Sequence, residues 1–301
     1  MSEIAAVIVT YKTKELLKTC LTSVFQECSR FLKEFNVIVV DNASGDGTVE
    51  MVRGEFPQVI LVENESNLGP AKAFNRGLKI ALEKAPVIIL ANSDIKVLGH
   101  TIQTMRGFLN DHPYVDGVCG PLLNPDLSRQ MMRTGIISLR RRDLTKRFRA
   151  TFVGTTFAMI RAATFRKVGG YDENYYFYNE DLDWAERAKR LNCHFTFLPD
   201  APVIHYLSRG SKQNKSRIIK ELYKSNVYFM KKFYGPLALL GLWSMRLEIG
   251  RIIGGLRAEL AKTTEAEERE AISQRIQDYL EARSRMDAEY RGKRRPAAPA
   301  F

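Results

Sequence analysis

The chain has 301 residues, of which 45% are hydrophobic and 27% are charged, so it can bury a sizeable core and is not disordered as a whole. Its formal net charge of +12 favours anionic partners such as phosphates, lipid headgroups or nucleic acid. Four scattered cysteines without a CxxC pair argue against a structural zinc site and indicate reduced thiols.

The first third of the chain alternates short apolar runs with amphipathic stretches. This alternation is typical of consecutive strand–helix units, and it predicts an α/β fold with a mostly parallel central sheet and helices on both faces. The predicted strands cover residues 4–10, 37–40, 59–62 and 87–90, and the predicted helices cover residues 15–25, 48–56, 71–82 and 100–109. In such a sheet, ligands bind beyond the carboxyl ends of the strands.

Polar residues gather where these predicted strands end. The clusters are Thr10-Tyr11, Asp41-Asn42-Ala43-Ser44, Asn67-Leu68-Gly69 and Asn92-Ser93-Asp94. Each cluster alone can be explained as a turn, and Asp94 alone as the N-cap of a following helix. Their joint placement at one sheet edge predicts a single binding site.

The second half begins after a loop rich in Pro, Asn and Arg at residues 121–149. Beyond it, the sequence predicts a strand at 151–160, a short helix, a turn at 168–172, the acidic cluster Glu180-Asp181-Leu182-Asp183, a helix at 184–191, and strands at 194–198 and 203–205. Asp183 and Arg187 are four residues apart, which predicts an ion pair along one helix face.

The chain is predicted to be helical from Lys215 onward. The apolar stretch 236–245 is about half the ~20 residues that a spanning helix needs, so it either lies in a lipid interface or packs on the preceding domain. The stretch 258–290 fits an extended helical hairpin, a helix that binds a partner, or the contact of a homodimer. The basic tail 291–301 is predicted to be disordered.

Together, the motifs resemble the family-2 inverting glycosyltransferases with the GT-A fold, and within them the rhamnosyltransferase-like branch. The segments that carry the resemblance are residues 7–11, 39–48, 67–69 with 75–77, 90–94, 169–173, 178–183 with Arg187, and His205 with Gly210-Ser211. It covers roughly residues 4–211. It implies a catalytic domain at 1–212, with a nucleotide-sugar half at 1–120 and an acceptor half at 150–212, followed by a helical extension at 213–290.

The resemblance implies a metal site for Mg²⁺ or Mn²⁺ on the donor diphosphate, with Asp94 as its carboxylate ligand. Asn92 stands where the family usually has the first Asp of its DxD motif, which makes the site less anionic. His205 ends an apolar strand, and it is either a structural histidine or a further metal ligand.

The resemblance also implies roles for the other strand-end residues and for the acidic cluster. Asp41 would accept a ring N–H of a pyrimidine base. The remaining nucleotide-binding candidates are Thr10, Tyr11, Asn75, Asn92 and Ser93. Asp181 would deprotonate the acceptor hydroxyl, with adjacent Glu180 raising its pKa through like-charge repulsion. The alternative explanation of these acids is an exposed helix N-terminus stabilised by the helix dipole.

The leading interpretation is an enzyme that moves a sugar, with L-rhamnose as one candidate, from a dTDP- or UDP-sugar to a glycan or lipid-linked acceptor in bacterial surface-polysaccharide synthesis. No secretory signal is evident, so we expect it in the cytoplasm, with the inner membrane face as an anionic partner.

The principal alternative is a nucleotide-binding assembly protein without turnover. A nucleic-acid binder is disfavoured because the basic run 140–149 lacks an aromatic-interleaved groove, and a dehydrogenase because no GxGxxG follows the first strand.

Overall fold

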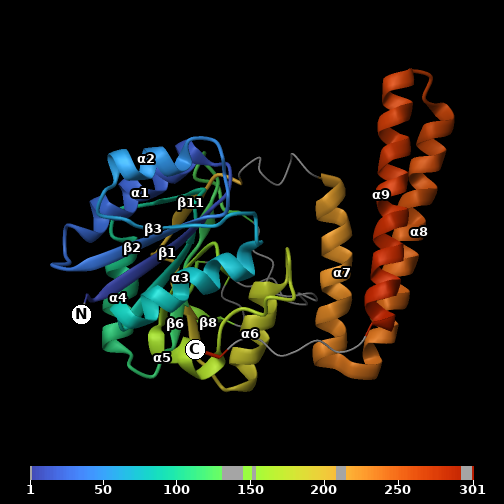
Figure 1. The fold of residues 1–301 in the computed structure, drawn as a ribbon. Coiled ribbons are helices and arrows are strands. Elements are labelled where there is room, and N and C mark those ends of the chain that lie inside the picture. The colour runs from blue at the N-terminus through green and yellow to red at the C-terminus, as the bar shows by residue number, and fades with distance from the viewer. Residues whose placement is uncertain (1, 131–144, 151–153, 208–214, 293–299) are drawn as a thin grey trace. The chain divides into compact units, whose positions relative to one another are not determined.

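The computed structural model of the chain describes residues 2–130, 145–150, 154–207, 215–292 and 300–301. It divides into two compact units (Figure 1). The α/β unit comprises Met1–Glu173, Glu180–Gly210 and Ala298–Phe301, and the helical unit comprises Asn174–Asn179 and Ser211–Ala297.

The α/β unit is built on an eight-stranded mixed sheet in the order β3-β2-β1-β4-β9-β6-β10-β8. Its strands are β1 (Ile4–Thr10), β2 (Phe35–Asp41), β3 (Ile60–Glu63), β4 (Val87–Asn92), β6 (Gly117–Cys119), β8 (Phe148–Ala150), β9 (Phe157–Arg161) and β10 (Phe195–Phe197). The first four strands pair in parallel, and β9 runs antiparallel between β4 and β6. The predicted α/β fold with a mixed, mostly parallel sheet is confirmed.

Helices cover both faces of this sheet because successive side chains of a strand point to opposite sides. Ile4, Ala6 and Ile8 of β1 enter one hydrophobic core, whereas Ala5 and Val7 enter another. The first core is closed by α1 (Lys14–Cys28), α2 (Thr48–Glu55) and α4 (Thr101–Asp111), and the second by α3 (Pro70–Lys84), α5 (Ala162–Val168) and α6 (Glu180–Arg190).

A second, three-stranded sheet lies beyond the end of β4. It has the order β5-β11-β7, with β5 at Ile95–Val97, β7 at Leu122–Leu123 and β11 at Val203–His205. Strand β11 runs antiparallel to β5, and their register sets His205 opposite Ile95. This small sheet therefore brings a late segment of the chain beside the turn that follows β4.

The helical unit is formed by α7 (Lys215–Tyr234), the short 3-10 helix η2 (Gly235–Leu237), α8 (Ala238–Lys262) and α9 (Ala266–Arg291). Its core joins side chains of all three long helices, among them Val227, Ile249 and Met286. The predicted hairpin is present as α8 and α9, but it turns at residues 263–265, so its first arm starts well before residue 258.

Several predictions for the middle of the chain need correction. The strand expected at 151–160 begins only at Phe157, and β8 at Phe148–Ala150 lies within the stretch predicted as a loop. The cause is the length of the strand, because a strand of three residues such as β8 shows too little periodicity to be detected in the sequence. The basic run Arg140-Arg141-Arg142 and the segment Ser208-Arg209-Gly210-Ser211 lie outside the described residues.

The C-terminal predictions concern the tail and the membrane. Within the tail predicted at 291–301, Arg291 ends α9 and Phe301 packs against the second core of the α/β unit. Among the described helices, none combines the length and the apolar character that a membrane crossing requires.

Candidate active site

The carboxyl ends of β1, β2 and β4 lie side by side and carry the predicted polar residues. Thr10 is the register partner of Asp41, and Val9 that of Asn92. A chain of hydroxyl groups crosses this edge, because Thr13 Oγ1 lies 3.0 Å from Thr10 Oγ1 and 2.7 Å from Ser93 Oγ. Thr13 carries no motif in the sequence that predicts this role, because its hydroxyl reaches Ser93 only through the pairing of β1 with β4.

Asp41 presents one unused oxygen at this edge. Its side chain is buried, its Oδ2 accepts a hydrogen bond from the Ser44 amide at 3.1 Å, and its Oδ1 has no hydrogen-bond partner among the described residues. Ser44 Oγ in turn accepts the Lys12 amide at 2.9 Å, which ties the loops after β1 and β2 together. A buried acceptor without a partner is costly, so Asp41 Oδ1 is suited to an N–H donor of a ligand.

Tyr11 lies at the rim of the same edge. Its ring is 38% exposed, and Lys12 Nζ lies 5.5 Å from the ring centroid. An exposed aromatic face next to a cation is available for stacking on a base, in keeping with the role predicted for this residue.

Asp94 and His205, which are far apart in sequence, meet at the second sheet. His205 Nε2 lies 3.4 Å from Asp94 Oδ1, and both side chains are largely buried. The Tyr206 amide donates to the Asp94 carbonyl at 2.9 Å, which fixes the two segments against each other. The two predicted metal ligands are therefore adjacent.

Gln130 holds the imidazole of His205 from the other side. Its Oε1 lies 3.0 Å from His205 Nδ1, and its Nε2 donates to the His205 carbonyl at 2.7 Å. Because the carbonyl can only accept, the amide orientation is fixed and Oε1 faces Nδ1, which must then carry the proton. Nε2 is therefore the ring nitrogen on the side of Asp94, and it is the one that could bind a metal.

Glu180 and Asp181 begin α6. Burial raises the pKa of both carboxyls, and the charge of Asp181 raises the pKa of Glu180 further. Glu180 Oε2 is buried and has no hydrogen-bond partner among the described residues, whereas Asp181 Oδ1 accepts the Leu182 amide at 2.8 Å. Repulsion between the two carboxylates acts on both groups, but the amide hydrogen bond favours the ionised form of Asp181 and Glu180 Oε2 has no such partner, so Asp181 is the first of the two to lose its proton.

The platform beneath these acids is rigid. The predicted ion pair is confirmed, with Arg187 Nε 2.7 Å from Asp183 Oδ1. Arg187 also donates to the carbonyls of Val168 and Gly170 at 2.7 and 2.6 Å. The buried Trp184 indole donates to a third carbonyl of this turn, that of Gly169, at 2.9 Å. Helix α6 is thereby fixed to the turn that follows α5.

Asn75 connects α3 to the same region. Its amide donates to the Tyr171 carbonyl and to Glu173 Oε1, both at 2.9 Å, and its oxygen accepts the Tyr171 amide at 2.8 Å. Burial raises the pKa of Tyr171, and the nearby charges of Asp181 and Glu180 raise it further, which places this ring near the acid pair. The Asn75 amide thus supports the loop beside α6, and its contact with the nucleotide stays a prediction.

A family model described as "Glycosyl transferase family 2" matches residues 5–169, more than half of the chain. The chain belongs to this family. The match spans the strand-end edge with Asp41 and Asp94, whereas the acid pair and His205 lie beyond it.

Curated relatives extend the match toward the C-terminus. The chain is 26% identical over 264 residues to the N-acetylglucosaminyl-diphospho-decaprenol L-rhamnosyltransferase of Mycobacterium tuberculosis, with coverage of 76% of this chain and 85% of the relative. This relation makes the domain rhamnosyltransferase-like within the family.

Solved structures show the same fold at lower identity. A mannosyltransferase from Pyrobaculum calidifontis in complex with GDP-Man and Mn²⁺ matches with a TM-score of 0.56 and 17% identity, over 96% of this chain and 85% of that one. TarS 1-349 of S. aureus, in complex with UDP, gives 0.56 and 17% over 97% and 92%. GalNAc-T7 with UDP, GalNAc and Mn²⁺ gives 0.57 and 14%, and this chain spans 47% of its length.

The residues of this family-2 domain fit a divalent cation that is shared with a ligand. Among the described residues, no cluster of three or more His, Cys, Asp or Glu side chains is arranged to hold a metal. The protein therefore offers a pair, Asp94 and His205, and phosphate oxygens and water would complete the coordination. Mg²⁺-type sites commonly combine one or two carboxylates with substrate phosphates, so the pair suits a cation that binds together with a diphosphate.

Proposed function

We propose that this protein is a metal-dependent inverting glycosyltransferase that moves a sugar from a nucleoside-diphosphate donor to a glycan or lipid-linked acceptor. The observation that carries the proposal is the convergence of Asp94 and His205 beside the strand edge that holds Asp41 and Ser93. If Asp94 had only a structural role, it would not need His205, a residue of a type that binds metals, beside it with the proton position on the ring fixed by Gln130.

The donor is proposed to carry uracil or thymine. Asp41 Oδ1 is a buried acceptor in need of a donor, and the N3–H of these two bases supplies one. L-Rhamnose as the sugar and a polyprenyl-linked acceptor are supported by the mycobacterial relative, whose name specifies both. On this basis we assign the protein to bacterial cell-surface polysaccharide synthesis at the cytoplasmic face of the membrane.

Asp181 acts as the base of a single displacement. The acceptor hydroxyl transfers its proton to the Asp181 carboxylate while its oxygen forms a bond to the anomeric carbon, and the bond from that carbon to the diphosphate breaks. The nucleoside diphosphate leaves with the electron pair, and the configuration at the anomeric carbon inverts. Glu180, which keeps its proton longer than Asp181, stays neutral beside the base and avoids a second buried charge.

A divalent cation, when bound by Asp94 and His205, supplies electrostatic stabilisation of the leaving diphosphate. The protein's own part is to present both ligands in fixed orientation. Gln130 and the Tyr206 amide provide that orientation.

The test is release of nucleoside diphosphate from a panel of dTDP- and UDP-sugars, with membrane extract as the source of acceptor. The proposal predicts release by the wild type only with Mg²⁺ or Mn²⁺, and loss of release in Asp181→Asn. Tight nucleotide binding without release from any donor would instead support the alternative, a nucleotide-binding assembly protein without turnover. The feature that favours this alternative is Asn92, which stands where the metal motif usually has its first Asp.

A further inference from the structure

The start of α8 exposes a group of large apolar side chains. Leu240 is 67% exposed, Trp243 61% and Leu247 42%, and Leu237 just before the helix is 62% exposed. Scattered single apolar residues are normal on a surface, whereas contiguous ones mark a contact site. The inferred function of the α/β unit makes no use of them.

These side chains form a stripe opposite the packed face of the helix. Leu240, Trp243, Leu247 and Gly250 follow one another at intervals of three or four residues, which is the spacing of one helix face. The packed face is formed by the buried residues Leu242, Met245, Ile249, Ile253 and Leu256. Helix α8 is thus apolar on two faces, and within the helical unit only one of them is covered.

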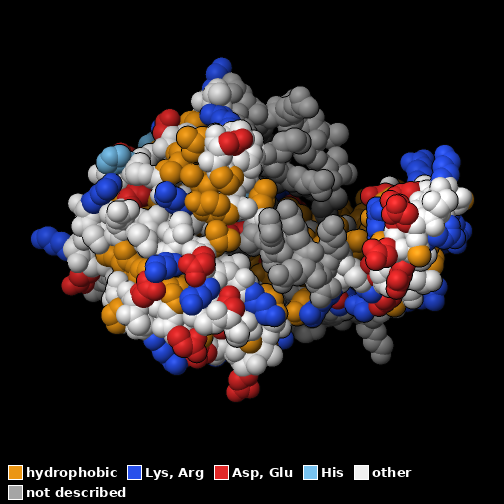
Figure 2. Space-filling model, turned by 90° about the horizontal axis from the view of Figure 1, so that it is seen from above, with side chains coloured by type: hydrophobic (Ala, Val, Ile, Leu, Met, Phe, Trp, Pro, Cys, Tyr) orange, Lys and Arg blue, Asp and Glu red, His pale blue; other side chains and the backbone are white. Residues whose placement is uncertain are grey.

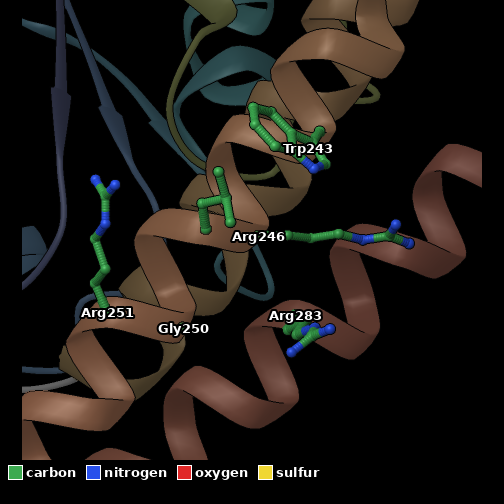
Figure 3. Close-up of a pocket in the computed structure, with 6 residues that line it drawn as sticks. Trp243, Arg246, Gly250, Arg251 and Arg283 are labelled. Atoms are coloured by element: carbon green, nitrogen blue, oxygen red, sulfur yellow. The ribbon is translucent and has the colours of Figure 1, made fainter.

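Arginines border the stripe. Trp243, Leu247 and Gly250 line a shallow hollow of about 510 Å³ together with Arg246, Arg251 and Arg283. Figure 3 shows Arg246 and Arg251 projecting from opposite sides of α8, with Arg283 reaching in from α9. Arg246 pairs with Asp287 at 2.9 Å, whereas Arg251 and Arg283 make no ion pair among the described residues. The hollow therefore carries an excess of positive charge next to apolar side chains.

The opposite end of the hairpin has a different character. Where α8 passes into α9, exposed acids such as Glu267 and Glu268 lie near the exposed base Arg269. Figure 2, seen from above Figure 1, shows acidic and basic side chains together on this end. Apolar and cationic side chains thus stand together in the first half of α8 and in the part of α9 beside it.

We propose that this stripe and its arginines, hereafter the α8 patch, bind an anionic phospholipid surface. Leucine and tryptophan enter the interface between headgroups and acyl chains, and arginine binds the headgroup phosphates. A second copy of the chain is the weaker occupant, because a symmetric pairing through this patch would bring the arginine-lined hollows of both copies together. This inference rests on the proposed function, because a lipid-linked acceptor lies at a membrane, and it names the surface that would hold the protein there.

The test is co-sedimentation of the full-length protein with vesicles of phosphatidylcholine alone and with 30% phosphatidylglycerol, at roughly physiological salt. The wild type is expected to bind the anionic vesicles and not the neutral ones. The double variants Leu240→Ser/Trp243→Ser and Arg251→Glu/Arg283→Glu are each expected to bind at least about tenfold more weakly, a factor that corresponds to about 1.4 kcal/mol.

Matched controls separate the patch from surface hydrophobicity and charge in general. Leu280→Ser removes an exposed leucine of α9 outside the patch, and Lys33→Glu reverses an exposed charge in the α/β unit. Both controls should bind like the wild type. Equal binding by all variants would overturn the proposal, as would a wild-type dimer in sedimentation that the Trp243 double variant converts to monomer.

A second assay shows whether the lipid-binding proposal for the α8 patch has failed or the proposed transferase function has failed. With a soluble acceptor analogue and no vesicles, the patch variants should release nucleoside diphosphate at the wild-type rate, because the transfer residues lie in the α/β unit. If the patch variants lost release in this assay but still bound anionic vesicles like the wild type, the α8 residues would serve the reaction and not the membrane.

Discussion

His205 Nε2 lies 3.4 Å from Asp94 Oδ1, although the two residues are 111 positions apart in the sequence. The antiparallel pairing of β5 with β11 creates this proximity, since it sets His205 opposite Ile95, the residue after Asp94. Gln130 then fixes the imidazole so that Nε2 faces the carboxylate. The three side chains form one preorganised unit, and its preorganisation can be measured.

Gln130→Leu should weaken Mn²⁺ binding by about tenfold, because loss of an outer hydrogen-bond partner of a metal-bound histidine typically has an effect of this size. The measurement is an electron paramagnetic resonance titration of Mn²⁺ in the presence of dTDP or UDP. Gln130→Glu retains an oxygen to accept the Nδ1 proton and should lose less affinity.

The tautomer of His205 provides a readout that requires neither metal nor turnover. In ¹⁵N spectra the wild type should show a protonated Nδ1, and Gln130→Leu should show a mixture of the two neutral tautomers. A wild-type spectrum with Nε2 protonated would contradict the role assigned to Gln130.

Asp41→Asn should remove the preference for bases that carry an N3–H. The wild type is expected to bind UDP and dTDP more tightly than CDP, whose ring N3 has no hydrogen. A hydrogen bond to a charged acceptor contributes about 1.5–3 kcal/mol, so the variant should bind UDP at least about tenfold more weakly and CDP almost unchanged. Calorimetric titration of the three nucleotides measures this, and an unaltered preference would exclude Asp41 from base recognition.

The pH dependence of kcat/KM should report the ionisation of Asp181. The base must be ionised to accept a proton, so the rate falls as pH falls through its pKa. Since burial raises that pKa, the acid limb should lie well above the value of about 4 that is ordinary for Asp.

Two variants test this assignment of the acid limb. Glu180→Gln should leave the limb in place, because Glu180 is already neutral where Asp181 titrates. Glu186→Gln, in the same helix but outside the pair, is the control. If the acid limb of the kcat/KM profile shifted to a different pH in Glu180→Gln, the base would be Glu180 and not Asp181.

Glu180 should also destabilise the fold at alkaline pH. Its pKa in the folded protein is raised, so the folded state holds this proton more tightly, and the resulting stabilisation is lost as pH rises through the raised pKa. Glu180→Gln should therefore unfold like the wild type near about pH 5, yet be more stable by on the order of 2 kcal/mol near about pH 9. Urea denaturation at both pH values measures this, and a variant that is less stable at alkaline pH would refute it.

The first half of the fold was predictable because its signals are local. Runs such as Ile4–Thr10 are long enough to show strand periodicity, and they match β1 residue for residue. The three-residue strands β5 and β11 give no comparable pattern, so sequence supplied Asp94 and His205 as candidates but not their adjacency. Thr13 and Gln130 escaped detection for the same reason, because their roles depend on strand pairing between distant segments.

Residue types alone do not reveal the hydrogen-bond partners of a polar side chain, as two cases show. Asn75 lies on the helix after a polar strand end, which favours a ligand contact, yet its amide is engaged by Tyr171 and Glu173. Likewise, the sequence shows that Glu180 and Asp181 are adjacent, but not that Asp181 Oδ1 accepts the Leu182 amide while Glu180 Oε2 has no hydrogen-bond partner among the described residues. Both cases show that partners, and not residue identity, decide the role of a polar group.

The most direct test of the account is the anomeric configuration of the transfer product, followed by proton NMR during turnover with the donor identified from the panel. A single base, Asp181, predicts a product inverted relative to the donor, with no product formed by Asp181→Asn. A product that retains the donor configuration would require either two successive displacements or attack from the face of the leaving group, and it would contradict the single inverting displacement proposed for this site.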